Sequence, residues 1–256
     1  MTDDTVTLAD DGSMPLLGFG TWQIYGREAY DAVRIALDVG YRHIDTATLY
    51  RNEAEVGRAL RDSGVAREDV FLTTKLHPDD VGRESEVLAA SLAGLGTDYL
   101  DLWLIHWPPR GRASVETWRT LVDALGKGSA RAIGVSNYST EQIDDIAAAT
   151  GVMPAANQIR WSPHLYDPRR VEELRTRGVV LEGYSPFRAS NLRDSVLVEI
   201  ASAHGVSAAQ VVLRWHLEHE FVVIPKSVRR ERIAANFDVF DFSLTAAEVA
   251  RIDGLS

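Results

Sequence analysis

Apolar residues recur along the chain in two alternating patterns. Short apolar runs are typical of buried strands, and the longer stretches after them space their apolar residues at i, i+3 and i+4, as amphipathic helices do. Strands are predicted at Leu16–Phe19, Tyr41–Ile44, Val70–Thr74, Leu100–Ile105, Ala130–Val135, Ala155–Ile159, Val179–Gly183 and Phe221–Ile224. Helices are predicted at Glu28–Val39, Glu53–Ser63, Arg83–Gly94, Ser114–Leu125, Thr140–Ala149, Pro168–Arg177, Leu192–His204, Ala208–Glu218 and Ala246–Asp253. This repeated alternation predicts an α/β fold of the (β/α)₈ type, a TIM barrel, rather than an open sheet.

The beginning of the chain predicts a short N-terminal β-hairpin. The runs Thr5–Leu8 and Met14–Leu17 flank Asp11-Gly12, a dipeptide typical of two-residue turns. Such a hairpin would close the bottom of the barrel. No Pro/Gly/Ser-rich linker or low-complexity segment interrupts the later pattern, so we expect residues 1–256 to form a single domain.

The charge balance limits the partners of the protein. The 256 residues include 27 Lys and Arg against 37 Asp and Glu, which gives a net charge of −10. Such an acidic chain is a poor electrostatic match for nucleic acid or anionic lipid, so we expect neither as a partner. A phosphate-bearing ligand would have to be held by a local cluster of basic residues.

Missing residue types exclude several kinds of chemistry. The chain has no cysteine, which rules out disulfides, thiolate-bound zinc, iron–sulfur clusters and thiol nucleophiles. No run approaches the ~20 apolar residues of a membrane helix. The residues Met1–Thr5 lack the basic and apolar character of a secretory leader. We therefore expect a cytoplasmic protein.

Reactive side chains follow three successive predicted strands. Asp45 and Tyr50 come after the second strand, Lys75 after the third and His106 after the fourth. Because a barrel carries its active site at the C-terminal ends of its strands, we expect these four side chains to meet at one face.

This set suits the reduction of a carbonyl group. Hydride delivered to a carbonyl carbon leaves an alkoxide that needs a proton, and Tyr50 could supply it. A lysine ammonium beside the phenol favours the phenolate and is expected to lower its pKa. Asp45 could hold Lys75, and His106 could orient the carbonyl oxygen. No strong nucleophile or metal-ligand cluster accompanies them, so a cofactor is expected to supply the hydride and no metal is expected.

Each of the four residues taken alone has a simpler interpretation. An aspartate after a strand often caps a helix, and a tyrosine or histidine near a barrel rim often packs or satisfies a local hydrogen bond. A lysine there is usually solvated. Their occurrence together at successive strand ends favours the catalytic interpretation.

A basic segment follows the last predicted strand. It contains Lys226, Arg229, Arg230 and Arg232 in an otherwise acidic chain. Barrels commonly bind phosphate near their last strands, at the start of an extra short helix. Lys226, Ser227 and Arg232 could hold a 2′-phosphate through charge-assisted hydrogen bonds. A solvated basic helix face is the alternative interpretation.

Three stretches of the chain resemble the motifs of the aldo-keto reductases. They are Gly40–Gly57, Val122–Tyr138 and Ile224–Ser227, the last followed by Arg232 and Asn236. The likeness runs from about Leu16 to the end, and it is greatest to compact microbial members of the 2,5-diketo-gluconate reductase type.

The resemblance implies an oxidoreductase that uses NADPH/NADP⁺ and acts on a small carbonyl compound. The catalytic tetrad would be Asp45, Lys75, His106 and Tyr50, with Tyr50 as the general acid. The implied cofactor contacts are Gly20, Thr21, Trp22, Asp45, Ser136, Asn137, Gln158, Tyr184, Ser185, Phe187, Lys226, Ser227, Val228, Arg229, Arg232 and Asn236. The implied substrate contacts are Trp22, Tyr50, His106 and Trp107, although packing at the core or rim is the commoner role of either tryptophan.

The chain departs from the family pattern in ways that affect substrate choice. Arg160 and Ser162 stand where the family often has Glu and His, and the segment after Trp107 is short. We expect an open pocket, and the resemblance leaves small aldehydes, methylglyoxal-like dicarbonyls, keto-sugars and keto-esters as candidates. It implies a monomer or weak dimer.

Other functions fit less well. Gly18-Phe-Gly20 does not complete a dinucleotide fingerprint, and the spacing of His216 and His219 misses the zinc-protease pattern. Gly183-Tyr-Ser-Pro lacks the closing glycine of a nucleophile elbow. A barrel that binds NADPH as a regulatory or structural protein stays open as the alternative, and another barrel enzyme such as an isomerase is more remote.

Overall fold

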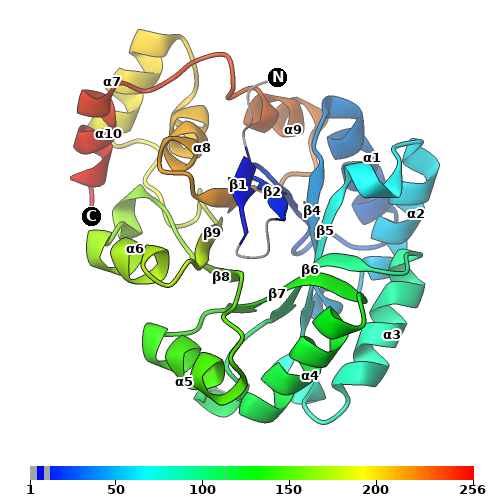
Figure 1. The fold of residues 1–256 in the computed structure, drawn as a ribbon. Coiled ribbons are helices and arrows are strands. Elements are labelled where there is room, and N and C mark those ends of the chain that lie inside the picture. The colour runs from blue at the N-terminus through cyan, green and yellow to red at the C-terminus, as the bar shows by residue number, and fades with distance from the viewer. Residues whose placement is uncertain (1–4, 9–11, 113) are drawn as a thin grey trace.

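The predicted strands form one parallel sheet that curls into a barrel (Figure 1). The computed structural model describes residues 5–8, 12–112 and 114–256. The strands follow one another around the sheet in chain order: β3 Phe19–Gly20, β4 His43–Asp45, β5 Phe71–Leu76, β6 Leu100–Ile105, β7 Ala130–Ser136, β8 Ala156–Arg160, β9 Val180–Tyr184 and β10 Val222–Ile224. A parallel bridge from Leu17 to Val223 joins the two edges, and the amide of Gly18 donates to the Val223 carbonyl at 2.9 Å. The (β/α)₈ prediction is confirmed.

Helices surround this barrel. They are α1 Gly26–Val39, α2 Glu53–Ser63, α3 Glu84–Leu95, α4 Val115–Gly126, α5 Thr140–Thr150, α6 Pro168–Arg175, α7 Ser195–His204, α8 Ala208–Glu218, α9 Arg230–Phe237 and α10 Ala246–Asp253. Short 3₁₀ turns lie at η1 Thr48–Tyr50, η2 Arg67–Asp69, η3 Pro78–Asp80, η4 Pro109–Gly111 and η5 Pro163–Leu165. Within the described ranges no single helix is long and apolar enough to cross a membrane, although the bent pair α7–α8 reaches that length and apolarity together.

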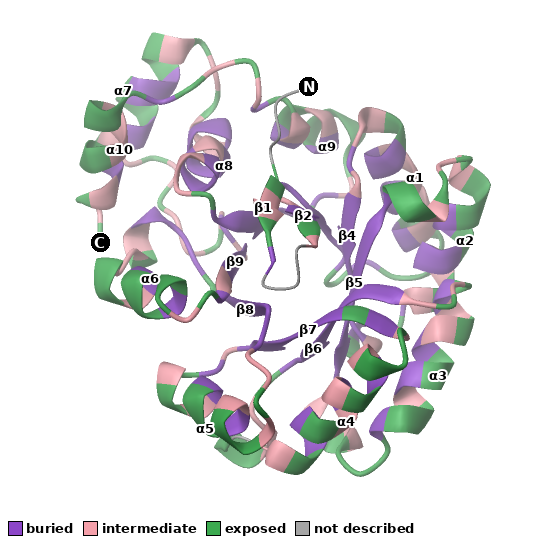
Figure 2. Cartoon of the chain, in the orientation of Figure 1, coloured by how far each residue is buried: buried purple, intermediate pink, exposed green. Residues whose placement is uncertain are grey.

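The helices bury the faces that their spacing predicts (Figure 2). In α1 the buried residues are Ala29, Ala32, Val33, Ala36 and Leu37, which recur at intervals of three and four and so lie on one side. β5 and β6 are buried along their whole length, as expected for parallel strands covered on both faces.

Two segments differ from the predicted helices. α7 begins at Ser195 rather than Leu192, because the side chain of Asp194 caps it by accepting from the Val196 amide at 2.9 Å. The basic segment continues into α9, which is absent from the predicted set because its mixed charges give it little apolar periodicity.

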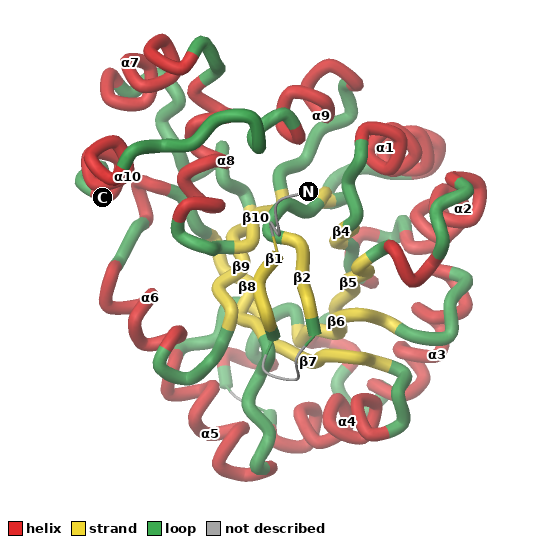
Figure 3. The backbone as a smooth tube through the Cα atoms, turned by 45° about the horizontal axis from the view of Figure 1, so that its top comes forward, coloured by secondary structure: helices red, strands yellow, loops and turns green. Residues whose placement is uncertain are grey.

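The N-terminal hairpin is present. β1 (Thr5–Thr7) pairs antiparallel with β2 (Ser13–Pro15), and Thr7 lies opposite Ser13. The predicted turn at Asp11-Gly12 falls between these two strands. Asp11 lies outside the described residues. Figures 1 and 3 both show the hairpin across one end of the barrel.

A close helix contact depends on a glycine. Gly57 of α2 packs against the end of α3, and a Cβ atom at this position would lie 2.5 Å from the carbonyl oxygens of Gly94 and Leu95. Any larger residue would push the two helices apart.

Candidate active site

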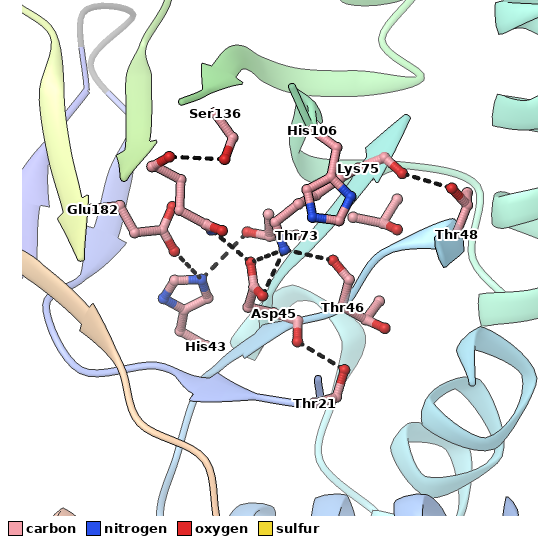
Figure 4. A network of polar contacts seen from close by, with 12 residues as sticks. Thr21, His43, Asp45, Thr46, Thr48, Thr73, Lys75, His106, Ser136 and Glu182 are labelled. Atoms are coloured by element: carbon pink, nitrogen blue, oxygen red, sulfur yellow. Dashed lines mark hydrogen bonds and ion pairs between the residues drawn. The ribbon is translucent and has the colours of Figure 1, made fainter. Parts of the chain in front are cut away.

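The four predicted catalytic residues come together at the C-terminal ends of the strands. Asp45 ends β4, Tyr50 ends η1, Lys75 lies in β5 and His106 directly follows β6. Side chains alternate along a strand, so Lys75 and Thr73 both point into the barrel (Figure 4). None of the four catalytic candidates is more than 8% exposed.

Asp45 and Lys75 form a buried ion pair. The Lys75 Nζ donates to the two carboxylate oxygens at 2.6 and 2.7 Å and to the Thr46 carbonyl at 2.9 Å. Gln158 Nε2 donates to the same carboxylate at 2.8 Å. Burial raises the pKa of Asp45, opposed by Lys75 and Gln158. Burial also acts to lower the pKa of Lys75, but attraction to Asp45 and Tyr50 raises it overall. Because both oxygens of Asp45 accept from donors, the carboxylate is ionised, and its negative charge keeps Lys75 protonated.

Tyr50 lies beside this pair with its phenol protonated. The Lys75 Nζ is 5.2 Å from the centroid of the ring. Burial raises the pKa of Tyr50 to about 12, although Lys75 opposes this shift. Lys75 therefore lowers the pKa of Tyr50 as expected, but the desolvation of the phenolate outweighs the attraction of the ammonium, so the net shift is upward.

His106 is held as a neutral ring between two aromatic residues. It meets the Tyr50 ring edge-on at 5.6 Å and stacks on Trp107 at 3.9 Å. Burial lowers the pKa of His106 to about 2, and the positive charge of Lys75 adds to this shift. The neutral imidazole can donate one N–H and is not a charged acid.

A chain of hydrogen bonds connects the ends of β7, β8 and β9. The Ser136 hydroxyl donates to the Gln158 carbonyl at 2.8 Å, and Asn137 Nδ2 donates to the Ser136 hydroxyl and to the His106 carbonyl. The Tyr184 hydroxyl donates to Asn137 Oδ1 at 2.9 Å. These side chains are thus oriented before any ligand binds.

Two turns next to this chain are strained. Asn137 and Ser185, which directly follow β7 and β9, have φ values of 62° and 56°. Residues other than glycine rarely adopt this left-handed conformation, and where they do so the surrounding structure fixes it, often at a functional site.

A cavity of about 620 Å³ opens over these residues. The predicted residues that line it are Gly20, Trp22, Asp45, Tyr50, His106, Trp107, Ser136, Asn137, Gln158, Tyr184, Ser185, Phe187 and Lys226. The predicted residues outside its lining are Thr21, Lys75, Ser227, Val228, Arg229, Arg232 and Asn236. Lys75 lies behind Asp45, and the Thr21 hydroxyl donates to the Asp45 carbonyl at 3.0 Å.

The basic segment continues from the cavity along α9. Lys226 reaches the cavity, and Arg229 occupies the N-cap of α9, where no side chain accepts from the first amides. The Ser227 hydroxyl accepts from the Arg229 amide at 3.2 Å. Arg230 turns away toward Asp38, at 3.9 Å. The start of the helix therefore presents amides without a side-chain cap next to exposed basic side chains, the groups that bind phosphate in proteins.

Sequence reasoning missed several residues of the cavity. Gln23, Arg160, Pro186, Arg188 and Ile224 also line it. Arg160 and Ile224 end strands, and this position could have indicated them from the sequence. The sequence marked Arg160 only as a departure from the family pattern.

The two residues that depart from the family pattern lie in different environments. Arg160 is exposed and lines the cavity. Ser162 is fully buried, and its hydroxyl donates to the Ala189 carbonyl at 3.0 Å. Ser162 thus joins the loop after β8 to the loop after β9.

Comparison with known proteins agrees with this geometry. The model of the aldo/keto reductase family matches residues 16–256. The chain is 44% identical to morphine 6-dehydrogenase of Pseudomonas putida, over 98% of this chain and 90% of that protein. It is 41% identical to glyoxal reductase of Bacillus subtilis, over 99% and 93% of the two chains. A solved structure of mutant Gox0644 in complex with NADPH superposes with a TM-score of 0.93 at 37% identity, covering 98% of this chain and 93% of that one.

The chain therefore belongs to the aldo-keto reductase family. Within that family it is an NADP-dependent oxidoreductase of the compact microbial type. The cavity lining includes the polar side chains of Ser136, Asn137 and Gln158 together with Lys226, groups that suit the amide and phosphate groups of such a cofactor.

Proposed function

We propose that the protein reduces aldehydes and ketones to alcohols with NADPH, and that Tyr50 is the general acid. The observation that carries this proposal is the position of the protonated Tyr50 phenol in the cavity, beside a lysine whose charge is fixed by Asp45. A protonated phenol is the form that can donate, and a nearby ammonium stabilises the phenolate that donation leaves.

A nicotinamide cofactor held here would supply the hydride. Tyr50 donates its proton to the carbonyl oxygen of the substrate as charge develops there. Lys75 stabilises the resulting phenolate, and Asp45 keeps Lys75 oriented. Neutral His106 donates a hydrogen bond to the same oxygen and so orients the carbonyl toward Tyr50.

The cofactor is proposed to lie along the cavity and the basic segment. Ser136, Asn137 and Gln158 would hold the carboxamide, and the Tyr184 ring would stack on the nicotinamide. The remaining contacts are proposed at Gly20, Thr21, Trp22, Asp45, Ser185 and Phe187, and toward the adenosine end at Lys226, Ser227, Val228, Arg229, Arg232 and Asn236. Arg232 would favour NADPH over NADH by binding the 2′-phosphate.

The substrate is proposed to enter between Trp22 and Trp107, which are 39% and 37% exposed at the cavity mouth. Small aldehydes, α-dicarbonyls, keto-sugars and keto-esters would fit between these walls, and the likeness to glyoxal reductase favours dicarbonyls. We further propose a cytoplasmic, single-domain protein that works as a monomer or weak dimer.

Quenching of NADPH fluorescence followed by loss of nicotinamide absorbance with a panel of aldehydes and α-dicarbonyls tests this function. Binding with turnover is expected. Binding without turnover on any carbonyl would overturn the reductase proposal in favour of a regulatory or structural barrel. Absence of NADPH binding would overturn the cofactor placement as well.

A further inference from the structure

A second carboxyl group lies inside the barrel below the Asp45–Lys75 pair. Glu182 of β9 is fully buried, and Figure 4 shows its side chain directed toward His43. Glu182 Oε1 lies 3.8 Å from His43 Nε2, and His43 Nε2 lies 3.3 Å from Thr73 Oγ1.

These three residues form a lower polar layer, which we define as His43, Thr73 and Glu182. His43 precedes Asp45 by two positions in β4, and Thr73 precedes Lys75 by two positions in β5. Side chains two positions apart lie on the same face of a strand, so the lower polar layer lies one step toward the N-terminal ends of the strands.

Glu182 has little support for a negative charge. Neither of its carboxyl oxygens has a hydrogen-bond partner in the described part of the chain, and 3.8 Å to His43 is too long for one. His43 offers no positive charge either, because burial lowers its pKa to about 3. An ionised carboxylate that is fully buried without a donor at hydrogen-bond distance is strongly unfavourable, so Glu182 is a neutral acid at neutral pH.

We propose that Glu182 is a positioning residue of the active site, held as a neutral acid so that it adds no second negative charge beside Lys75 to that of Asp45. Lys75 then directs its positive field at Tyr50. The charged or titratable groups around Glu182 are His43 and Asp45 from β4 and Lys75 from β5. The neighbours paired with it in β8 and β10 are the uncharged Gln158 and Val222.

Ionisation of Glu182 would make Tyr50 a weaker acid. Burial raises the pKa of Glu182 to about 8 and Asp45 raises it further, whereas Lys75 and the Gln158 amide oppose the shift. Above that pH a second negative charge next to Lys75 would raise the pKa of Tyr50 and slow proton donation. Turnover in the direction of reduction should therefore fall as Glu182 ionises.

The test is the pH profile of kcat for aldehyde reduction at saturating NADPH, in the wild type and in Glu182→Gln. At about pH 6.5 both proteins carry a neutral group at this position, and their kcat values should agree within about twofold. At about pH 9 the kcat of the variant should exceed that of the wild type on the order of threefold or more, because the amide side chain cannot ionise.

Glu84→Gln is the matched control. Glu84 is a buried carboxyl of α3 that accepts from the Thr117 hydroxyl at 2.9 Å, away from the cavity lining. This variant should keep the wild-type pH profile. An alkaline decrease in kcat that is the same in wild type and Glu182→Gln would overturn the proposal.

This inference rests on the acid role proposed for Tyr50, and a second readout separates the two. The infrared carbonyl band of a protonated carboxyl should be present in the wild type at pH 7, be absent in Glu182→Gln, and titrate together with kcat. Absence of the band with turnover intact overturns the role of Glu182 alone. Turnover that survives Tyr50→Phe overturns the acid role and this positioning role with it, whatever the band shows. If Glu182→Gln does not fold, the wild type alone serves as the test. The infrared band and kcat should then titrate at the same pH, and titration at different pH values would overturn the proposal.

Discussion

Gln158 Nε2 donates to Asp45 Oδ2 at 2.8 Å across the barrel, although 113 positions separate the two residues in the chain. Gln158 belongs to the side of the cavity proposed for the nicotinamide, and Asp45 holds the lysine next to the proposed acid. One hydrogen bond thus connects the place where hydride would arrive with the place from which the proton would leave. This connection is buried, so it is little screened by solvent.

Replacing Tyr50 by phenylalanine should remove the acid and keep the ring. We expect kcat for carbonyl reduction to fall by about 10²- to 10⁴-fold, the usual contribution of a positioned acid, while NADPH binding stays unchanged. Stopped-flow turnover and NADPH fluorescence measure the two effects. Wild-type kcat in this variant would rule out Tyr50 as the acid.

Replacing Arg232 by alanine should weaken NADPH binding and leave NADH binding nearly unchanged. Loss of a charge-assisted bond to the 2′-phosphate corresponds to about tenfold or more in Kd. Arg230→Ala is the control, because Arg230 is exposed in the same helix but faces Asp38. Equal losses for the two cofactors in Arg232→Ala would contradict 2′-phosphate binding there.

The buried Glu182 should make stability depend on pH. Its pKa is about 8 in the folded protein against an ordinary value of 4.5, so the unfolded state releases this proton at lower pH. The contribution of Glu182 to stability is therefore fully present below about pH 4.5, and it is lost, on the order of a few kcal/mol, as pH rises toward 8. Urea unfolding at several pH values should give Glu182→Gln a stability gain over wild type that grows across this window. A difference independent of pH would mean that Glu182 is already ionised in the folded protein.

Gly57→Ala should destabilise the contact between α2 and α3. The added Cβ would meet two backbone carbonyl oxygens at 2.5 Å, and backbone cannot move aside as a side chain can. We expect a loss of about 1–3 kcal/mol in the free energy of unfolding. The matched control is Gly126→Ala at the end of α4, where nothing lies within 4 Å of the new atom. Similar stabilities for the two variants would show that the helices separate at little cost.

Much of the site was predictable because barrel chemistry is tied to strand ends. A short apolar run marks a strand locally, and the residue after it falls at the C-terminal face whatever the rest of the chain does. Asp45, Tyr50, Lys75 and His106 could therefore be grouped from the sequence, and the structure brings them together. The same reasoning did not find Arg188, which follows β9 by several residues and lies over Trp22 at 5.3 Å. Its position depends on the path of a loop that carries no periodic signal.

The sequence by itself determined the order of strands and helices, the family, and the residues that could carry the reaction, because these follow from local periodicity and from motifs. Only the tertiary structure decided the charge of those residues. The pKa of Tyr50 is raised overall although Lys75 lowers it, and Glu182 becomes a buried neutral acid, because strands far apart in the chain remove both groups from water. Desolvation depends on everything that packs around a group, so no local stretch of sequence contains it.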